Sequence, residues 1–518
     1  MAIYNYSNEP TIDYSNNANI EKYHEGFDVI NAYVGNEFPI VIDGERIYTG
    51  KTYHSLNPAN HKEVIGVMHQ ADEAYAHKAM QAAQAAFKTW RNVSASARAD
   101  VLFKAASILR RRRYEFNALM TKEAGKPYNE ADGDTAEAID FLEWYARQML
   151  SLTRTDDLIH SGKPFERNEF RYIPLGVGAV ITPWNFPLAI LTGMTASAIV
   201  TGNTVLLKPA ITTQVIAYKL FEVLEDAGMP KGVVNLIPGD GPEVGEFMVK
   251  HPKTAFINFT GSKAVGTTIY EEAAKVRPGQ IWFKRVVAEM GGKDAIVVDE
   301  DFDAVEAARI IAKGAFGFSG QKCSACSRAI IHENIYDDVI KALKEVTEDL
   351  ILGDPSEAAT FMGPLNDEAA FKKVSSYIDI GKTEGTLLTG GQYDNSKGYF
   401  VHPTIFTDVA SDARIMHEEI FGPVLAVCKV GSFDEALEVA NNTEYGLTGS
   451  LLSYDRSKLE RARESFHVGN LYFNRSCTGS IVGYQPFGGF NMSGTDAKAG
   501  GPDYLLNFLQ GKTITEQF

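Results

Sequence analysis

The chain has 518 residues, of which 45% are hydrophobic and 22% charged. These proportions exclude disordered, collagen-like and fibrous proteins, and the length allows about three domains at roughly 100 to 200 residues each. The net charge of −16 argues against a nucleic-acid partner, because such binding needs a basic face. Small molecules are therefore the expected ligands.

Four cysteines are too few for a disulfide scaffold of this size, which indicates a reducing compartment. The first residues have neither a signal-peptide pattern nor the Arg-rich character of a transit peptide. No stretch approaches the roughly 18 uninterrupted apolar residues of a membrane span. We expect a cytoplasmic protein with no membrane partner.

The N-terminal forty residues, rich in Asn, Tyr and Asp, predict an irregular arm that wraps a surface. From about Ala71 to Leu150, apolar residues recur at spacings of three and four, as in AYAHKAMQAAQAAFKTW and ADVLFKAASILRRRRYEFNALM. This periodicity predicts successive amphipathic helices with a scaffold role.

After Arg171 the pattern changes to short apolar runs, each followed by a helical stretch: VGAVIT, NTVLLK, VVNLI and TAFINFT. Continuous apolar runs are typical of parallel strands buried on both faces, and the ligands of such sheets bind at the carboxyl ends of the strands. The loops after these runs are therefore the places to look for a site.

A second alternation begins near Glu289, with DAIVVDE, a helix over residues 303–318, RAIIHE, and a helix over residues 335–352. It predicts a second α/β domain. The C-terminal segment YLLNFLQGKTITEQF ends in an alternating run that could add a strand to a neighbour's sheet edge. Self-association is one interpretation of this end, and an unstructured tail is the other.

The clearest chemical signal is Cys323 in FGFSGQKCSACSR, just before a strand-like run. A nucleophilic cysteine reacts as the thiolate, and this requires a partly exposed, polar or electropositive setting, which SGQKCSA is expected to supply. Cys323 and Cys326 also form a CxxC pair, which alone would indicate a redox disulfide or half of a zinc site. No second CxxC or CxxH follows in the sequence, so we predict no metal. An inert core cysteine is the remaining interpretation.

Two further residues, Glu289 and Asn185, could assist a nucleophilic cysteine. Glu289 precedes a Gly-Gly turn that opens a strand, a position from which a carboxylate could act as general base for water. Asn185 lies between two prolines in VGAVITPWNFPLAI, which hold it rigidly, and its amide could donate to an oxyanion. An ordinary surface glutamate and a turn asparagine are the structural alternatives.

Cofactor signals are weaker when each is taken alone. IPGDGPEVG supplies Gly239, Gly241 and Gly245, with one residue more than the usual dinucleotide fingerprint. FTGSKAVG predicts a helix start that could face a pyrophosphate, and Lys208 in LLKPA could bond ribose hydroxyls.

In order, the motifs PWNFP, KPA, FTGS, EMGGK, GQKCSA, EEIFGPV, YGLTGS and QPFGGFNMSG resemble those of the aldehyde dehydrogenase superfamily over nearly the whole chain. The resemblance implies an α/β fold with a Rossmann-like NAD-binding domain, an α/β catalytic domain and a small β oligomerisation flap. The expected ranges are 1–40 for the N-terminal arm, 41–152 and 175–288 for the NAD-binding domain, 289–488 for the catalytic domain, and 153–174 with 489–518 for the bridging segment.

The resemblance also implies roles. Cys323 attacks the aldehyde carbon, its backbone N–H and the Asn185 amide form the oxyanion hole, and Glu289 activates the water that hydrolyses the thioester. The cofactor-binding residues that it implies are Thr182, Pro183, Trp184, Lys208, Gly241, Gly261, Ser262, Glu419 and Phe421.

One departure concerns cofactor choice. Many members of the superfamily have a glutamate three residues after the lysine, where this chain has Ile211. A carboxylate there would repel the 2′-phosphate of NADP, so its absence predicts that NAD is preferred and NADP tolerated.

Within the superfamily, the C-terminal stretch NRSCTGSIVGYQPFGGFNMSGTDAKAGGPDYLLNFL is similar to that of the 1-pyrroline-5-carboxylate dehydrogenases. This similarity implies oxidation of L-glutamate γ-semialdehyde to L-glutamate in proline breakdown, with a separate proline dehydrogenase for the preceding step. The implied substrate-binding residues are Ser324, Gly479, Ser480, Phe186 and Phe487. Another semialdehyde or a broad range of aldehydes remains the alternative substrate, and a redox or metal protein or a silent homologue the alternative class.

Overall fold

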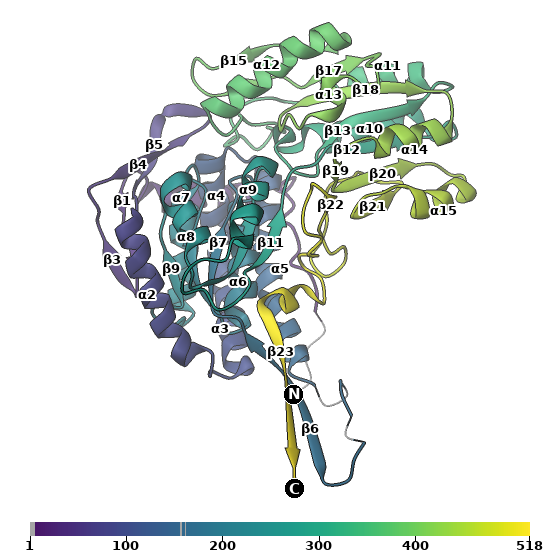
Figure 1. Ribbon diagram of the computed structural model, residues 1–518. Coiled ribbons are helices and arrows are strands. Elements are labelled where there is room, and N and C mark those ends of the chain that lie inside the picture. Colours follow the sequence, from purple (N-terminus) through teal and green to yellow (C-terminus); the bar gives the residue numbers. More distant parts are fainter. Residues whose placement is uncertain (1–5, 156–157, 161) are drawn as a thin grey trace.

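The computed structural model describes residues 6–155, 158–160 and 162–518. Two seven-stranded sheets, each flanked by helices, form most of the molecule, and a two-stranded ribbon projects from it (Figure 1). The α/β class expected from the sequence is confirmed.

The N-terminal arm is more regular than its composition predicts. It contains a helix, α1 (Asn17–Asn31), that begins where the Asn16 side chain accepts a hydrogen bond from the Ala18 N–H at 3.0 Å. Tyr23 and Ile30 on this helix are fully buried against the following helices, so an irregular arm over the whole of residues 1–40 was wrong. The buried residues of α1 stand among polar ones, so the sequence pattern did not reveal its buried face.

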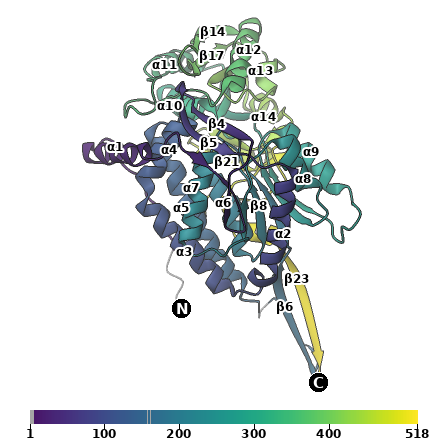
Figure 2. The same ribbon diagram turned by 90° about the vertical axis from the view of Figure 1, so that its left-hand side faces the viewer.

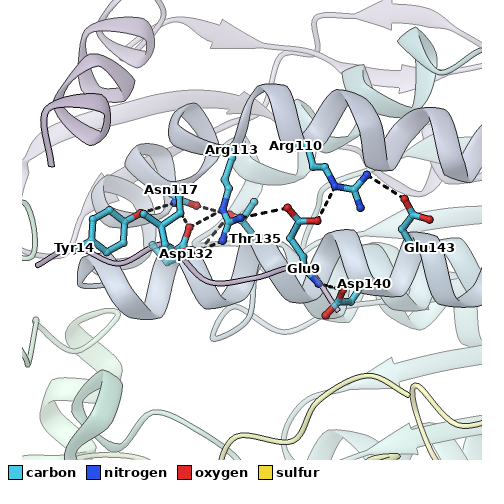
Figure 3. Close-up of polar contacts among 11 residues, drawn as sticks. Glu9, Tyr14, Arg110, Arg113, Asn117, Asp132, Thr135, Asp140 and Glu143 are labelled. Atoms are coloured by element: carbon cyan, nitrogen blue, oxygen red, sulfur yellow. Dashed lines mark hydrogen bonds and ion pairs between the residues drawn. The ribbon is translucent and has the colours of Figure 1, made fainter. Parts of the chain in front are cut away.

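The residues that precede α1 lie in extended form across the helical layer (Figure 3). The Glu9 N–H donates to Asp140 at 2.7 Å and the Ile12 N–H donates to Asp132 at 2.7 Å. The arm therefore wraps a surface, as expected, through bonds from its backbone to buried carboxylates.

The predicted scaffold helices are confirmed. They are α2 (Glu73–Trp90), α3 (Ala95–Arg111), α4 (Arg113–Ala124) and α5 (Tyr128–Leu152). Asp72 caps the start of α2 by accepting from the Tyr75 N–H, and Gly125 ends α4 in the left-handed region at φ 68°. Figure 2 shows α2 on one face of the first sheet and α3 to α5 on the other.

The first sheet has the order β11-β10-β7-β8-β9-β2-β3. Strands β7 to β11 are parallel, as the apolar runs predict, and β2 and β3 add an antiparallel edge. The bounds are β2 (Ile40–Ile42), β3 (Glu45–Ile47), β7 (Val177–Ile181), β8 (Thr204–Lys208), β9 (Val234–Leu236), β10 (Thr254–Thr260) and β11 (Arg285–Glu289). Chain order reverses between β7 and β10, and such a reversal marks the place where doubly wound sheets bind ligands.

Helices α6 (Ala189–Val200), α7 (Gln214–Asp226) and α9 (Lys263–Ala274) connect these strands, with a π-helical turn η1 (Gly241–Gly245) leading into α8 (Glu246–Lys250). A small sheet packs beside them with the order β1-β5-β4. Its strands are β1 (Glu37–Phe38), β4 (Thr52–Asn57) and β5 (Asn60–His69).

The second sheet has the order β14-β17-β18-β13-β12-β20-β21, parallel except for β14. The bounds are β12 (Asp294–Val298), β13 (Cys326–His332), β14 (Thr386–Thr389), β17 (Thr404–Thr407), β18 (Val424–Val430), β20 (Thr448–Leu452) and β21 (Asn470–Phe473). Its helices are α10 (Ala304–Phe316), the 3₁₀ turn η2 (Gly317–Gly320), α11 (Tyr336–Glu348), α12 (Glu368–Glu384), α13 (Arg414–His417), α14 (Phe433–Asn441) and α15 (Arg456–Ser465). Two short antiparallel pairs complete this part: β15 (Tyr393–Asp394) with β16 (Phe400–Val401), and β19 (Tyr445–Gly446) with β22 (Phe490–Asn491).

The C-terminal strand β23 (Leu509–Gln517), preceded by η3 (Tyr504–Phe508), pairs along its whole length with β6 (Glu166–Pro174). The alternating end is therefore a strand of a ribbon within its own chain, and not an unstructured tail. Figure 1 shows this ribbon extending away from both sheets. Across residues 6–155, 158–160 and 162–518, none of the helices has the length and apolar character that crossing a bilayer requires.

Candidate active site

The site lies where the two sheets meet. Strand β11 ends the first sheet at Glu289, and β12 opens the second at Asp294, with four residues between them. The loops after β7 and β10, the strands between which chain order reverses, supply Thr182 to Asn185 and Gly261 to Ser262. Residues far apart in the sequence thus reach one seam.

The backbone before Cys323 is strongly bent. Phe318, Ser319 and Gly320 have φ of 50°, 56° and 67°, a left-handed conformation that costs free energy for residues other than glycine. A Cβ at position 320 would lie 2.4 Å from the carbonyl oxygen of Gly422, so this turn packs directly on the loop that carries Phe421. The bend brings Cys323 to the amino end of β13.

Acidic groups surround the Cys323 thiol, and its side chain is only partly exposed. Burial raises the pKa of this thiol well above its ordinary value, and Asp294, Glu289 and Glu419 raise it further. The setting is partly exposed, as expected, but it is not electropositive, because the ammonium of Lys322 pairs with Glu130 at 2.7 Å. This arrangement favours the neutral thiol form of Cys323.

Asn185 is buried, with 5% of its surface exposed, and its Nδ2 donates to the carbonyl oxygen of Gln321 at 3.2 Å. This bond joins the loop after β7 to the segment that leads into Cys323. The structure therefore brings the predicted amide donor and the predicted nucleophile together.

Glu289 is nine-tenths buried, and among the residues that the structure describes neither carboxylate oxygen has a hydrogen-bond partner of standard geometry. Burial raises its pKa well above the ordinary value, while Lys498 and the nearby backbone N–H of Gly489 oppose the shift. A buried carboxylate without partners has its proton-accepting capacity free for water or substrate.

Glu419 and Phe421 approach from the loop before β18. The Gly292 N–H donates to Glu419 at 3.1 Å, and a Cβ at Gly291 would lie 2.2 Å from the same carboxylate, so the Gly-Gly turn is needed for this approach. Phe421, at φ 60°, meets Trp184 edge to face with 5.5 Å between ring centroids. Loops of both sheets thus contact each other here, and the Glu419 carboxylate acts on the Cys323 thiol.

A second cluster lies at the carboxyl end of β8. Lys208 is buried, which lowers the pKa of its ammonium to about 8, and its chain lies 3.7 Å from the Cβ position of Gly245 in η1. Gly241 begins η1, and Ser262 caps α9 by accepting from the Val265 N–H. These residues, with Gly261 bonded to the Glu289 carbonyl at 3.0 Å, form the far end of a site suited to an elongated ligand.

The predicted substrate loop packs against the nucleophile segment. Cys477 donates its thiol to the Ser324 carbonyl at 3.4 Å, and Gly479 takes φ 78°. Arg475 bonds the carbonyls of Thr478 and Gly479 at 2.7 and 2.8 Å, which shapes the turn, and Ser480 donates to the Gln485 carbonyl. Phe487 is held by a bridge to Ala499.

A polar layer beneath Phe186 escaped sequence analysis. Lys126 and Asp134, both fully buried, pair at 2.7 Å, and the Lys126 ammonium lies 4.1 Å from the centre of the Phe186 ring. Glu137, one turn along α5, has its pKa raised to about 8 by burial and by Asp134. Helical periodicity alone did not identify these residues. The one available signal was that charged residues stand on the predicted buried face of this helix.

Comparisons with known proteins agree with this geometry. Residues 47–514 match the Aldehyde dehydrogenase family. The chain is 60% identical over 511 residues to a 1-pyrroline-5-carboxylate dehydrogenase of Bacillus cytotoxicus, with 99% of each chain covered.

Solved structures of similar proteins superpose closely on this chain. A 1-pyrroline-5-carboxylate dehydrogenase from Thermus with bound NAD superposes with a TM-score of 0.98 at 47% identity, over 100% of both chains. Proline utilization A from Bdellovibrio bacteriovorus superposes with a TM-score of 0.96 at 43% identity, over 99% of this chain and 53% of that one. This chain belongs to the aldehyde dehydrogenase family.

Proposed function

We propose that the chain oxidises L-glutamate γ-semialdehyde to L-glutamate with NAD, using Cys323 as a covalent nucleophile. The observation that carries this proposal is the convergence of Asn185, Cys323 and Glu289 at the seam between the sheets, where Trp184 also contacts Phe421. The substrate is that of the relatives named above, which match this chain over its full length.

Cys323 Sγ forms a bond to the aldehyde carbon as the carbonyl π bond opens and places its electron pair on the oxygen. The thiol proton passes to solvent water. The resulting oxyanion accepts hydrogen bonds from the Asn185 amide and the Cys323 backbone N–H. Two donors held in place before the reaction are worth about 2.7–4 kcal/mol each in comparable enzymes. Asn185 is held for this role by its bond to Gln321.

The residues present fit a dinucleotide. Ser262 caps a twelve-residue helix whose N–H groups can face a pyrophosphate, Lys208 and Gly241 lie at the adenosine end, and Glu419 and Phe421 lie beside Cys323. Thr182 and Pro183 belong to the loop at the chain reversal that leads to Trp184. When bound, NAD supplies the acceptor for the hydride that leaves the substrate carbon.

Glu289 takes the proton of a water molecule, which attacks the thioester on Cys323 and releases the carboxylate product. A general base works best with a pKa near the working pH, and burial moves Glu289 in that direction. Its unpartnered oxygens leave it free to accept this proton.

The substrate carboxylate is assigned to the turn at Ser324, Gly479 and Ser480, where left-handed Gly479 lets backbone N–H groups approach an anion closely. Phe186 and Phe487 are assigned to the walls around the aliphatic part of the substrate. Support comes from the contact between Cys477 and Ser324, which joins this turn to the nucleophile segment.

The test is a steady-state panel of L-glutamate γ-semialdehyde, succinate semialdehyde and propanal, each with NAD and NADP. We expect the first substrate to have the highest kcat/KM, with NAD preferred and NADP tolerated because Ile211 lacks a carboxylate. If the first substrate has no advantage, the chain is a broader aldehyde dehydrogenase and the assignment of the turn at Gly479 is wrong.

Replacing Cys323 with Ala should abolish aldehyde oxidation and leave NAD binding intact, as measured by calorimetry. Cys326→Ala is the matched control, since Cys326 is buried and 1% exposed, and it should retain activity. Substantial turnover by Cys323→Ala, or an acyl adduct on another side chain by mass spectrometry, would refute the covalent role of Cys323.

Further proposals concern the domains of the chain, its self-association and its location in the cell. We assign residues 41–152 and 175–288 to NAD binding, 289–488 to catalysis, and the ribbon of β6 and β23 to self-association. The exposed edges of this ribbon leave backbone groups available for pairing with a second copy. We also assign the protein to the cytoplasm, with its substrate supplied by a separate proline dehydrogenase.

A further inference from the structure

The carboxyl group of Glu289 lies in a recess walled by glycines. A Cβ at Gly488 would lie 3.2 Å from its Oε1, and a Cβ at Gly494 would lie 3.3 Å from both of its oxygens. The same segment pairs with the end of β11, because the Met290 N–H donates to Ser493 at 2.7 Å and the Thr495 N–H donates to Ala288 at 2.9 Å. Side chains larger than hydrogen at these two glycines would crowd the carboxylate.

Lys498 holds the outer side of this recess. Its Nζ donates to the carbonyl oxygen of Gly469 at 2.9 Å and to that of Gly488, and it pairs with Asp496 at 3.2 Å. The Cα of Gly488 therefore lies beside the Glu289 carboxylate, and its carbonyl oxygen accepts a hydrogen bond from Lys498. Gly488 lies between the Lys498 ammonium and the Glu289 carboxylate, and these two groups form no direct ion pair.

Charged and titratable groups face Glu289 from several elements. Lys498 favours its charged form and Asp496 disfavours it, both from the segment after β22. The Cys323 thiol faces it from the loop before β13, and the Tyr504 hydroxyl faces it from η3. Within this set the ammonium of Lys498 is the positive charge that opposes burial.

We propose that Lys498 is a positioning residue for the general base, bracing the glycine-walled recess and placing a positive charge behind the Glu289 carboxylate. The inference rests on the proposed role of Glu289. The charge keeps part of the Glu289 population ionised in its recess, ready to accept the proton of the hydrolytic water. The two carbonyl bonds keep the Gly488 wall at the distance that this requires. Asp496 moderates the effect by sharing the ammonium.

The experiment follows decay of the acyl adduct on Cys323 by rapid quench and intact mass, in the full-length enzyme, across pH 5 to 10. Lys498→Met removes the positive charge, so the rising limb should move to higher pH by about one unit, a tenfold loss of rate on its acid side. Asp496→Asn removes a negative charge, so the limb should move to lower pH. Asparagine tolerates the left-handed φ of 55° at this position.

Two controls separate charge from structure. Lys498→Arg keeps the charge and should keep the limb near its original pH. Lys341→Met removes the same charge from an exposed position on α11 and should change nothing. A merely structural role for Lys498 would lower the rate of Lys498→Met at every pH and would leave the limb at its original pH.

The outcomes distinguish the two levels of the argument. If Glu289→Gln retains the limb in its residual activity, the limb belongs to another group and the role proposed for Glu289 fails. If Glu289→Gln abolishes the limb but Lys498→Met and Asp496→Asn leave it in place or move it in the same direction, only the inference about Lys498 is refuted. Should Lys498→Met not fold, Lys498→Gln removes the same charge and takes its place, and an unmoved limb in that variant refutes the inference about Lys498.

Discussion

Two buried carboxylates in this molecule have opposite surroundings. Asp132, 1% exposed beneath the N-terminal arm, accepts from Arg113 Nε at 2.7 Å, Arg113 Nη2 at 2.8 Å, Asn117 at 2.9 Å and the Ile12 N–H at 2.7 Å (Figure 3). Glu289, 9% exposed at the seam between the sheets, has no hydrogen bond of standard geometry.

The difference separates a carboxylate that stabilises the fold from one that is kept for chemistry. Four donors make the Asp132 carboxyl group part of the structure, because they replace the water lost on burial. Glu289 lacks this compensation, so its carboxylate costs stability and keeps its oxygens free. The same contrast applies to two buried lysines: Lys126 forms an ion pair, whereas Lys293 has no hydrogen-bond partner in the described part of the chain.

The largest expected effect is on catalysis by Glu289→Gln. The amide cannot accept a proton from water, so hydrolysis of the acyl adduct on Cys323 should slow by about 10²–10⁴-fold, the contribution of a general base. Formation of the adduct should persist. Single-turnover rapid quench measures both steps, with Asp132→Asn assayed below its melting temperature as the control that retains both rates.

The same change of acid to amide should have opposite consequences for stability at the two positions. Asp132→Asn leaves the Arg113 guanidinium buried without its counter-charge and should cost about 3–5 kcal/mol of unfolding free energy. Glu289→Gln should be neutral or stabilising above the ordinary pKa of 4.5, because the raised pKa of Glu289 imposes a penalty that grows as pH rises. Urea unfolding at pH 7 compares them, and equal losses would break the contrast between the two sites.

Hydrophobic periodicity was enough to predict the two α/β units and the helices from α2 to α5. Most of the parallel strands are short and largely apolar, as burial of both faces requires. The pattern did not predict α1, since its buried residues Tyr23 and Ile30 stand among polar ones. It also left open the pairing of β23 with β6, because a register between distant strands depends on the path of the chain between them.

The candidate site was predicted as a set of residues, through ordered motifs, but its electrostatics were not. Cys323 lies among Asp294, Glu289 and Glu419, and the nearby Lys322 is bound to Glu130 on α5. Which charges surround a thiol depends on side chains brought together by folding, and a local sequence window holds only Lys322. Lys498 escaped notice for the same reason, since nothing in FNMSGTDAKAGG marks its position behind Glu289.

The smallest effect concerns Lys293, which is 1% exposed with an ammonium that makes no hydrogen bond. Burial lowers its pKa from 10.5 to about 7, so between these pH values folding requires loss of a proton. The penalty is absent above about pH 10.5, grows as pH falls, and is complete below about pH 7. Lys293→Met should therefore raise the unfolding free energy by about 1–3 kcal/mol at pH 6, the usual cost of an unpaired buried polar group, and by little at pH 10.

Lys126→Met, at a fully buried position paired with Asp134, is the matched control and should destabilise the protein. Loss of stability in Lys293→Met at pH 6 would mean that this ammonium is compensated in the folded state, and the contrast between paired and unpaired buried charges would then not extend to the lysines.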